Sequence, residues 1–338
     1  MSNRIPFCDL SRALAPLREE IRQAIDRVMD RGWFLRGPET RSFEEEWAAY
    51  CGQRFCVACN SGTDALTLAA KALELHQAEV PANTLALTAI GLQQAGAEVT
   101  IRDVDNDGHL PEVGATTVPV LLYGRAPNDI ELECTLFDAA HAHGWKPPLH
   151  AVACWSFYPT KSLAALGDAG AITTNDAGLA EGMIALTGRD DAFRDSRQMT
   201  SRMDEIQAAV LRIKVRYLDD WLAERRSIAA QYIDELGEAV IPVARGAADL
   251  HHLFVVRAPR RDELMNYLKV NNIETKIHWA QPLHRMQATW ANTCSSFPCT
   301  DSWSSSILSL PCYPGLTTEE ITRICDSVHE FFKTTPLR

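Results

Sequence analysis

Lys161 is the residue whose surroundings point most clearly to covalent chemistry. It stands in the segment 155–163 (WSFYPTKSL), which leaves a predicted strand and enters a loop broken by Pro159. A lysine on a loop is usually a solvated charge. The apolar neighbours here would desolvate the ammonium, lower its pKa and free a neutral amine to attack a carbonyl carbon.

Asp138 comes directly after the predicted strand 134–137 (CTLF). Ligands of open α/β sheets bind at the carboxyl ends of the strands, where a carboxylate could pair with a protonated ring nitrogen. The alternative is that Asp138 caps a helix that follows. His141 and His143 come next, but two residues apart on a helix they would face apart, which disfavours a metal site.

Residues 60–65 (NSGTDA) form a turn between a predicted strand and a predicted helix. Free backbone N–H groups and the helix dipole make such a turn a site for phosphate. A simple helix cap by Ser61 or Thr63 remains the alternative. Cys51, Cys56 and Cys59 have a spacing superficially like that of an iron–sulfur protein, but no fourth ligand matches, and we expect free thiols.

Short β-rich runs alternate with helical stretches from about residue 55 to 175. This alternation predicts an α/β domain whose mostly parallel sheet is covered on both faces. A long amphipathic stretch then runs from about residue 203 to 235, and the remainder indicates a smaller α+β domain, closed by a helix with a capping box of Thr317 and Glu320. We therefore expect a large domain over 1–235 and a smaller one over 236–338.

The composition limits the classes of partner. The 338 residues are 46% hydrophobic, which is enough for a sizeable core, and the net charge is −11 because Asp and Glu outnumber Lys and Arg 44 to 33. Such a charge offers no general attraction for nucleic acid or anionic lipid. With neither a signal-peptide stretch nor a membrane-spanning stretch, the sequence predicts a cytosolic protein.

Many segments, in the same order, resemble the DegT/DnrJ/EryC1/StrS family of sugar aminotransferases. They are 5–10 (IPFCDL), 32–52, 60–69 (NSGTDALTLA), 80–84 (VPANT), 137–144 (FDAAHAHG), 156–175, 201–214, 277–284 (IHWAQPLH) and 308–317. The resemblance spans nearly the whole chain. It implies the aspartate-aminotransferase-like fold of the fold-type I enzymes, with pyridoxal 5′-phosphate as cofactor.

The resemblance also implies roles for individual residues. Lys161 would be the Schiff-base lysine, and Asp138 would keep the pyridine nitrogen protonated. The remaining cofactor-binding positions would be Gly62, Thr63 and Ser156 at the phosphate, His141 near the ring oxygen, Leu85 against the ring, and Thr200 from the neighbouring subunit of a homodimer. Candidate substrate-binding residues are Trp33, Phe34, Tyr158 and His284.

The implied reaction transfers an amino group from glutamate or glutamine to a nucleotide-linked keto sugar. Segments 80–84 and 32–39 look more like relatives acting on 3-keto than on 4-keto sugars. Two alternatives stay open: a dehydratase, against which Lys161 argues because such relatives carry histidine there, and a non-catalytic protein that binds the cofactor or a sugar nucleotide. Two departures from the family pattern are Leu85 in place of an aromatic residue and Thr200 in place of asparagine.

Overall fold

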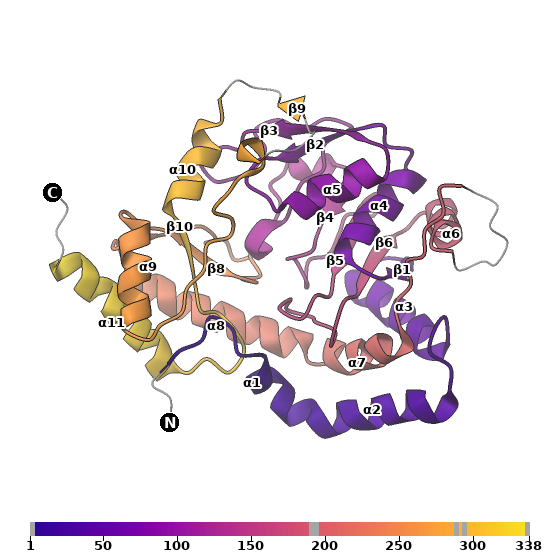
Figure 1. Ribbon diagram of the computed structural model, residues 1–338, viewed down its shortest axis with the longest axis horizontal. Helices are drawn as coiled ribbons and strands as arrows, with labels where there is room; N and C mark the ends of the chain where they lie inside the picture. The colour runs from indigo at the N-terminus through magenta and orange to yellow at the C-terminus, as the bar shows by residue number, and fades with distance from the viewer. Residues whose placement is uncertain (1–3, 189–195, 287–290, 293–295, 335–338) are drawn as a thin grey trace.

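The computed structural model describes residues 4–188, 196–286, 291–292 and 296–334. Helices alternate with strands between residues 38 and 102, and three further strands then follow before the next α-helix, as Figure 1 shows. The strands are β1 (Phe55–Cys59), β2 (Gln77–Pro81), β3 (Glu98–Arg102), β4 (Leu136–Asp138), β5 (Val152–Ser156) and β6 (Gly170–Thr174). The helices are α1 (Leu10–Leu14), α2 (Arg18–Arg31), α3 (Pro38–Cys51), α4 (Gly62–Ala72), α5 (Ala86–Gln94) and α6 (Ala177–Leu186).

The strands form one mixed sheet. Four of them lie in the order β1-β6-β5-β4, and β2 and β3 pair with β9 (Ala291–Asn292) in a second group. Residues 117–120 join the groups, because Thr117 pairs with Glu79 of β2 and Val120 pairs with Asp138 of β4. The pairs β4–β5, β2–β3 and β3–β9 are parallel, and β6 pairs antiparallel with both β1 and β5. The predicted α/β class with a mostly parallel, mixed sheet is confirmed.

Helices cover both faces of this sheet, because side chains alternate along the buried strands. In β5, Ala153 and Trp155 pack on one side with residues of α3, α7 (Glu205–Val215) and the first half of α8 (Leu218–Leu236). Val152 and Cys154 point to the other side, toward α4, α5 and α6. The core thus has two apolar layers, one on each face of the sheet.

A third apolar cluster lies in the C-terminal part. It is built by the second half of α8 with β8 (Phe254–Arg257), α9 (Arg261–Val270), β10 (Ile307–Leu310) and α11 (Thr318–Thr334), together with Ile5. Outside this cluster, β7 (Ile241–Pro242) pairs with β8, and α10 (Pro298–Ser306) leads into β10. Because α8 contributes to the clusters of both parts, the division at residue 235 stays a prediction. The capping box is confirmed: Thr317 and Glu320 exchange backbone-to-side-chain hydrogen bonds of 3.0 and 3.2 Å.

The structure differs from the sequence predictions at three places along the chain. Residues 116–124, one of the β-rich runs of the predicted α/β domain, form no regular strand; they make isolated bridges and then a 3-10 turn at Leu122–Gly124 with Tyr123 at φ 66°. No helix follows Asp138, because residues 140–144 form turns. The amphipathic stretch is two helices, since the chain breaks at Arg216 and Tyr217 between α7 and α8.

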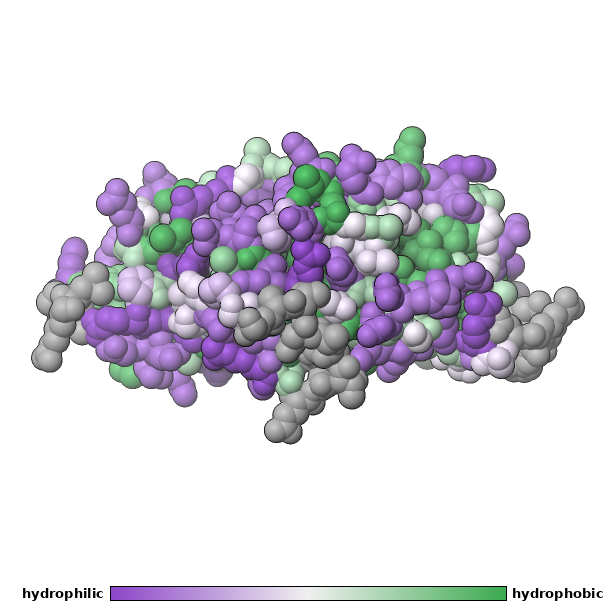
Figure 2. All heavy atoms as spheres, turned by 90° about the horizontal axis from the view of Figure 1, so that it is seen from above, coloured by the Kyte–Doolittle hydropathy of each residue, from purple (hydrophilic) through white to green (hydrophobic). Residues whose placement is uncertain are grey.

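The residues that the structure describes contain neither a membrane-spanning helix nor a metal-binding cluster. No helix there is long and apolar enough to cross a membrane. Nor do three or more His, Cys, Asp or Glu side chains gather there in an arrangement that could hold a metal ion. The face seen in Figure 2 is largely hydrophilic, with hydrophobic residues in separate areas.

A buried carboxylate joins α7 to the start of α3. Glu205 is fully buried and accepts hydrogen bonds of 2.9 Å from the backbone N–H groups of Gly37, Glu39 and Thr40. These are donors that a helix N-terminus leaves without intrahelical partners. Gly37 is required because a Cβ there would lie 2.4 Å from a carboxylate oxygen of Glu205.

We predict that Glu205→Ala lowers the free energy of unfolding by about 2–4 kcal/mol, because it leaves several buried N–H groups unpaired. Chemical denaturation measures this change. The matched control is Asp204→Ala, since the neighbouring Asp204 is exposed and its side chain caps nothing. Equal effects of the two substitutions would contradict this account of Glu205.

Candidate active site

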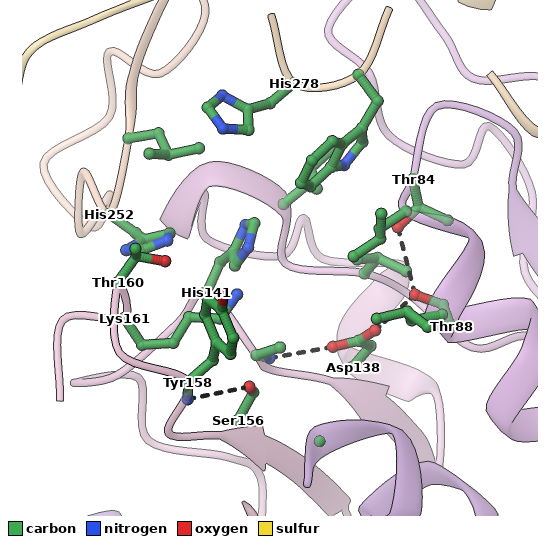
Figure 3. Close-up of a pocket in the computed structure, with 18 of the residues that line it drawn as sticks. Thr84, Thr88, Asp138, His141, Ser156, Tyr158, Thr160, Lys161, His252 and His278 are labelled. Carbon is green, nitrogen blue, oxygen red and sulfur yellow. Dashed lines mark hydrogen bonds between the residues drawn. The ribbon is translucent and has the colours of Figure 1, made fainter. Parts of the chain in front are cut away.

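A cavity of about 440 Å³ opens at the carboxyl ends of β4 and β5. Its floor is formed by these strand ends and the N-terminus of α4, and its other side by residues 252–253 and 276–279. Figure 3 shows Lys161, His141 and Asp138 around this hollow, with His252 and His278 on the C-terminal side. The cavity therefore lies where the two parts of the chain meet.

Lys161 reaches the cavity from a tight turn after β5. Its backbone N–H donates to the carbonyl of Tyr158 over 2.8 Å, which closes the turn around Pro159. Burial of the ammonium lowers the pKa of Lys161 to about 8, and the negative charge of Asp138 opposes this shift. A substantial fraction of the side chain is thus a neutral amine near pH 8.

Asp138 is buried at the end of β4, and two donors fix its carboxylate. The hydroxyl of Thr88 donates to Oδ2 over 2.7 Å, and the backbone N–H of Ala140 donates to Oδ1 over 3.1 Å. Burial raises the pKa of Asp138, while these hydrogen bonds and the charge of Lys161 act against the rise. The carboxylate caps a turn rather than a helix, so the helix-cap alternative is wrong.

The turn before α4 forms a narrow cradle. Ser61, not Thr63, is the helix cap, because its hydroxyl accepts from the N–H of Asp64 over 3.1 Å. A Cβ on Gly62 would lie 2.7 Å from Cβ of Ser156, so only glycine lets the helix N-terminus approach the end of β5. Ser61, Gly62, Thr63 and Ser156 line this part of the cavity, so hydroxyl groups and the N-terminus of α4 lie together beside it.

The two histidines after Asp138 have different surroundings. The backbone N–H of Tyr123 donates to Nδ1 of His141 over 3.1 Å, which leaves the ring proton on Nε2, and burial holds the pKa of His141 well below its usual value. His141 therefore lines the cavity as a neutral hydrogen-bond donor. His143 is fully buried against Trp155 and Phe157, outside the cavity.

Not every predicted site residue reaches the cavity. Leu85 and Tyr158 line it, together with Gly62, Thr63, Asp138, His141, Ser156 and Lys161. Trp33 and Phe34 do not: their side chains are 47% and 49% exposed on the surface of this chain. His284 also lies outside this cavity, with its ring stacked on that of Phe297 at 4.3 Å between centroids, and its role as a substrate-binding residue stays a prediction. Thr200 is exposed and outside the cavity.

Several residues that line the cavity were not predicted from the sequence. They are Thr88, Arg225, His252, Lys276, His278 and Trp279. Most come from segments far along the chain, whose approach to Lys161 no local pattern reveals. For Arg225 a signal existed, since it falls at helical spacing among Leu218, Leu222 and other buried residues of α8.

Comparison with known proteins identifies the family. The DegT/DnrJ/EryC1/StrS aminotransferase family matches residues 16–117 and 132–329. The chain is 36% identical to the dTDP-3-amino-3,4,6-trideoxy-alpha-D-glucose transaminase of Streptomyces venezuelae, covering 97% of this chain and 96% of the relative. It is also 36% identical to the erythromycin biosynthesis sensory transduction protein EryC1 of Saccharopolyspora erythraea, covering 93% and 96%.

A solved structure extends the likeness to the fold. DesV of S. venezuelae, in complex with a ketimine intermediate, matches with a TM-score of 0.90 and 34% identity over 98% of this chain and 99% of DesV. Fold and cavity together are those of a fold-type I aminotransferase that uses pyridoxal phosphate. The chain belongs to the DegT/DnrJ/EryC1/StrS aminotransferase family.

The residues of the cavity fit pyridoxal phosphate. The cradle in which a Cβ on Gly62 would collide with Ser156 offers hydroxyl and N–H donors to a phosphate. Asp138 offers a fixed, buried carboxylate to a ring nitrogen, and Lys161 offers an amine of lowered pKa to an aldehyde. The polar groups of the cavity thus match the three polar ends of the cofactor.

We predict that cofactor-free protein takes up pyridoxal phosphate faster as the pH rises, about tenfold per unit below pH 8, with a plateau above it. The sign follows because only the neutral amine attacks an aldehyde and burial lowers the pKa of Lys161 to about 8. Stopped-flow absorbance measures the rate. An ordinary lysine would show no plateau before about pH 10.

Lys214 is the internal control for this assignment. Burial also lowers the pKa of Lys214 to about 8, but its ammonium donates to the carbonyl of Ala164 and lies outside the main cavity. Borohydride reduction followed by peptide mapping should place the cofactor on Lys161. Label on Lys214 would show that pKa alone, rather than the geometry of the cavity, selects the lysine.

Proposed function

We propose that this aminotransferase converts a nucleotide-linked keto sugar to the amino sugar, with glutamate or glutamine as amino donor and carbon 3 of a 6-deoxyhexose as acceptor. The observation that carries the proposal is one cavity that holds a lysine amine of lowered pKa and a fixed, buried carboxylate. The choice of carbon rests on the similar transaminase from Streptomyces venezuelae, whose name describes a 3-amino sugar.

In this proposal Lys161 has two roles. Pyridoxal phosphate, when bound, withdraws electrons from the carbon that carries the amino group. Lys161 is the residue that would hold the cofactor through its Nζ, and the same Nζ would be the base that takes the proton from that carbon. Burial suits the second role as well, because it keeps the pKa of the amine near the working pH.

The other residues that line the cavity would orient the cofactor and stabilise its charges. Asp138 would keep a proton on the pyridine nitrogen, and the hydrogen bond from Thr88 fixes the carboxylate for this role. His141 would donate from Nε2 to the ring oxygen, since its Nδ1 already accepts from Tyr123. Gly62, Thr63 and Ser156 would hold the phosphate, Leu85 would pack against the ring, and Tyr158 at the cavity mouth would contact substrate.

A second candidate is a protein that binds the cofactor or a sugar nucleotide without turnover. The name of EryC1, a sensory transduction protein at 36% identity, favours it. Lys161 in the cavity favours catalysis instead, and it also argues against the dehydratase alternative. The predicted cytosolic location is compatible with each of these functions and stays a prediction.

We predict that the cofactor-loaded protein, supplied with glutamate, aminates dTDP-3-keto-6-deoxyhexoses at least about tenfold faster than the 4-keto isomers, a difference of about 1.4 kcal/mol in activation free energy. Mass spectrometry of the product from a matched pair of isomers measures the ratio. A preference for the 4-keto isomer would refute the assignment of the carbon. Binding without any product would favour the sensor.

We further propose that the working unit is a homodimer with its active sites at the interface. Trp33, Phe34 and Leu35 are 37–49% exposed on one loop, a group that suits a subunit contact. Leu35 pairs with Asp204, and Glu205 binds both the loop and the start of α3, so this loop lies close in space to the segment that carries Thr200. In a dimer, Thr200, Trp33 and Phe34 would then reach the partner's site.

We predict that Phe34→Asp yields monomers with weaker cofactor binding, whereas Val270→Asp does not, because Val270 is 82% exposed but lies at the end of α9. Sedimentation and cofactor titration measure both effects. Thr200→Asn should strengthen cofactor binding, since the longer side chain reaches further. A fully active monomer would show that each site is complete within one chain.

A further inference from the structure

We propose that Arg225 binds the carboxylate of the amino-acid donor and of the 2-keto acid that it becomes. The proposal rests on the proposed function and deepens it by naming the residue that recognises the donor. Arg225 lies in the middle of α8, whose apolar face packs on both parts of the chain. It lines the main cavity and also a smaller cavity of about 260 Å³, and Lys161 and Thr160 line both as well.

The guanidinium of Arg225 is buried without a compensating charge. The residue is only 4% exposed, and no carboxylate of the described residues lies within ion-pair distance of it. Its Nη1 donates to the carbonyls of His252, over 2.9 Å, and Cys312, over 2.5 Å, while its Nε has no partner among the described residues. Carbonyls satisfy donors but carry no net charge, so a buried cation remains unpaired.

An anionic ligand would remove this penalty, and the donor supplies one in the right place. The carboxylate of an α-amino acid is bonded to the carbon that carries the amine, so it must lie beside the residue that reacts with that carbon. Arg225 lines the same cavities as Lys161 and is tied to His252, whose ring lies 4.4 Å from the ring of His141. A guanidinium also matches the two oxygens of a carboxylate with paired N–H groups.

The other anions of the reaction have different candidate sites. Neutral donors at the start of α4 would meet the cofactor phosphate, and a guanidinium that is only 4% exposed leaves little room for the larger diphosphate of a nucleotide. Lys276 also lines the cavity, but it is exposed and lies over the ring of Phe7 at 5.2 Å, where water and salt screen its charge. Of the anions in the reaction, Arg225 would therefore bind only the carboxylate of the amino-acid donor or of its keto acid.

The test is the binding of glutarate, a five-carbon dicarboxylate that cannot react, to the cofactor-loaded protein by titration calorimetry. We expect Arg225→Gln to weaken glutarate binding about tenfold or more, as loss of a charge-assisted hydrogen bond does. Thymidine diphosphate binding should change less than about twofold, because the nucleotide has no carboxylate. The matched control is Arg226→Gln, since Arg226 is adjacent but exposed and lines neither cavity.

Unchanged glutarate affinity in Arg225→Gln would overturn the proposal. An equal loss of affinity for glutarate and for thymidine diphosphate would also overturn it, because such a loss indicates that the substitution damages the whole site. If Arg225→Gln does not fold, Arg225→Lys decides: the charge stays but the paired N–H groups are lost, and we expect about threefold weaker glutarate binding with unchanged nucleotide binding. If Arg225→Lys binds glutarate as tightly as the unsubstituted protein does, the proposed role of Arg225 is refuted. If no keto sugar is aminated while Arg225→Gln still loses glutarate selectively, the proposed function fails and this inference stands.

Discussion

Desolvation of Lys161 is the constraint on which the rest of the site depends. The amine is useful only while its pKa stays near 8, and the nearby charge of Asp138 acts against this shift. Burial of the amine outweighs that charge, so the pKa of Lys161 still falls to about 8. Hydrogen bonds from Thr88 and Ala140 hold the carboxylate of Asp138 in place for a ring nitrogen.

The fold supplies this arrangement through its mixed sheet. Asp138 and Ser156 end neighbouring parallel strands, so the carboxylate and the phosphate cradle lie at one edge. The antiparallel β6 brings Gly170 against Ser61, where a Cβ would lie 2.3 Å from backbone atoms, and so draws the N-terminus of α4 to the same edge. The long helix α8 contributes to both apolar clusters, and its residue Arg225 lines the cavity.

Much of this was predictable from the sequence, because strand ends and glycine turns are local features. The alternating strands, the turn at Gly62 and the positions of Asp138 and Lys161 follow from patterns of a few residues. The turn after Asp138 was not predictable, since its residues resemble a helix and tertiary contacts such as the bond from Tyr123 to His141 decide its shape. The C-terminal wall of the cavity depends on long-range packing, which no local pattern encodes.

The fate of the donor nitrogen shows whether this protein transfers an amino group to a sugar. Cofactor-loaded protein would be given ¹⁵N-glutamate and then a nucleotide-linked 3-keto sugar, and the sugar would be isolated for mass spectrometry. The account predicts ¹⁵N in the sugar product and 2-oxoglutarate as the co-product, with both lost when Lys161 is replaced by alanine. A sugar recovered without ¹⁵N, from protein that binds both the cofactor and the nucleotide, would contradict it.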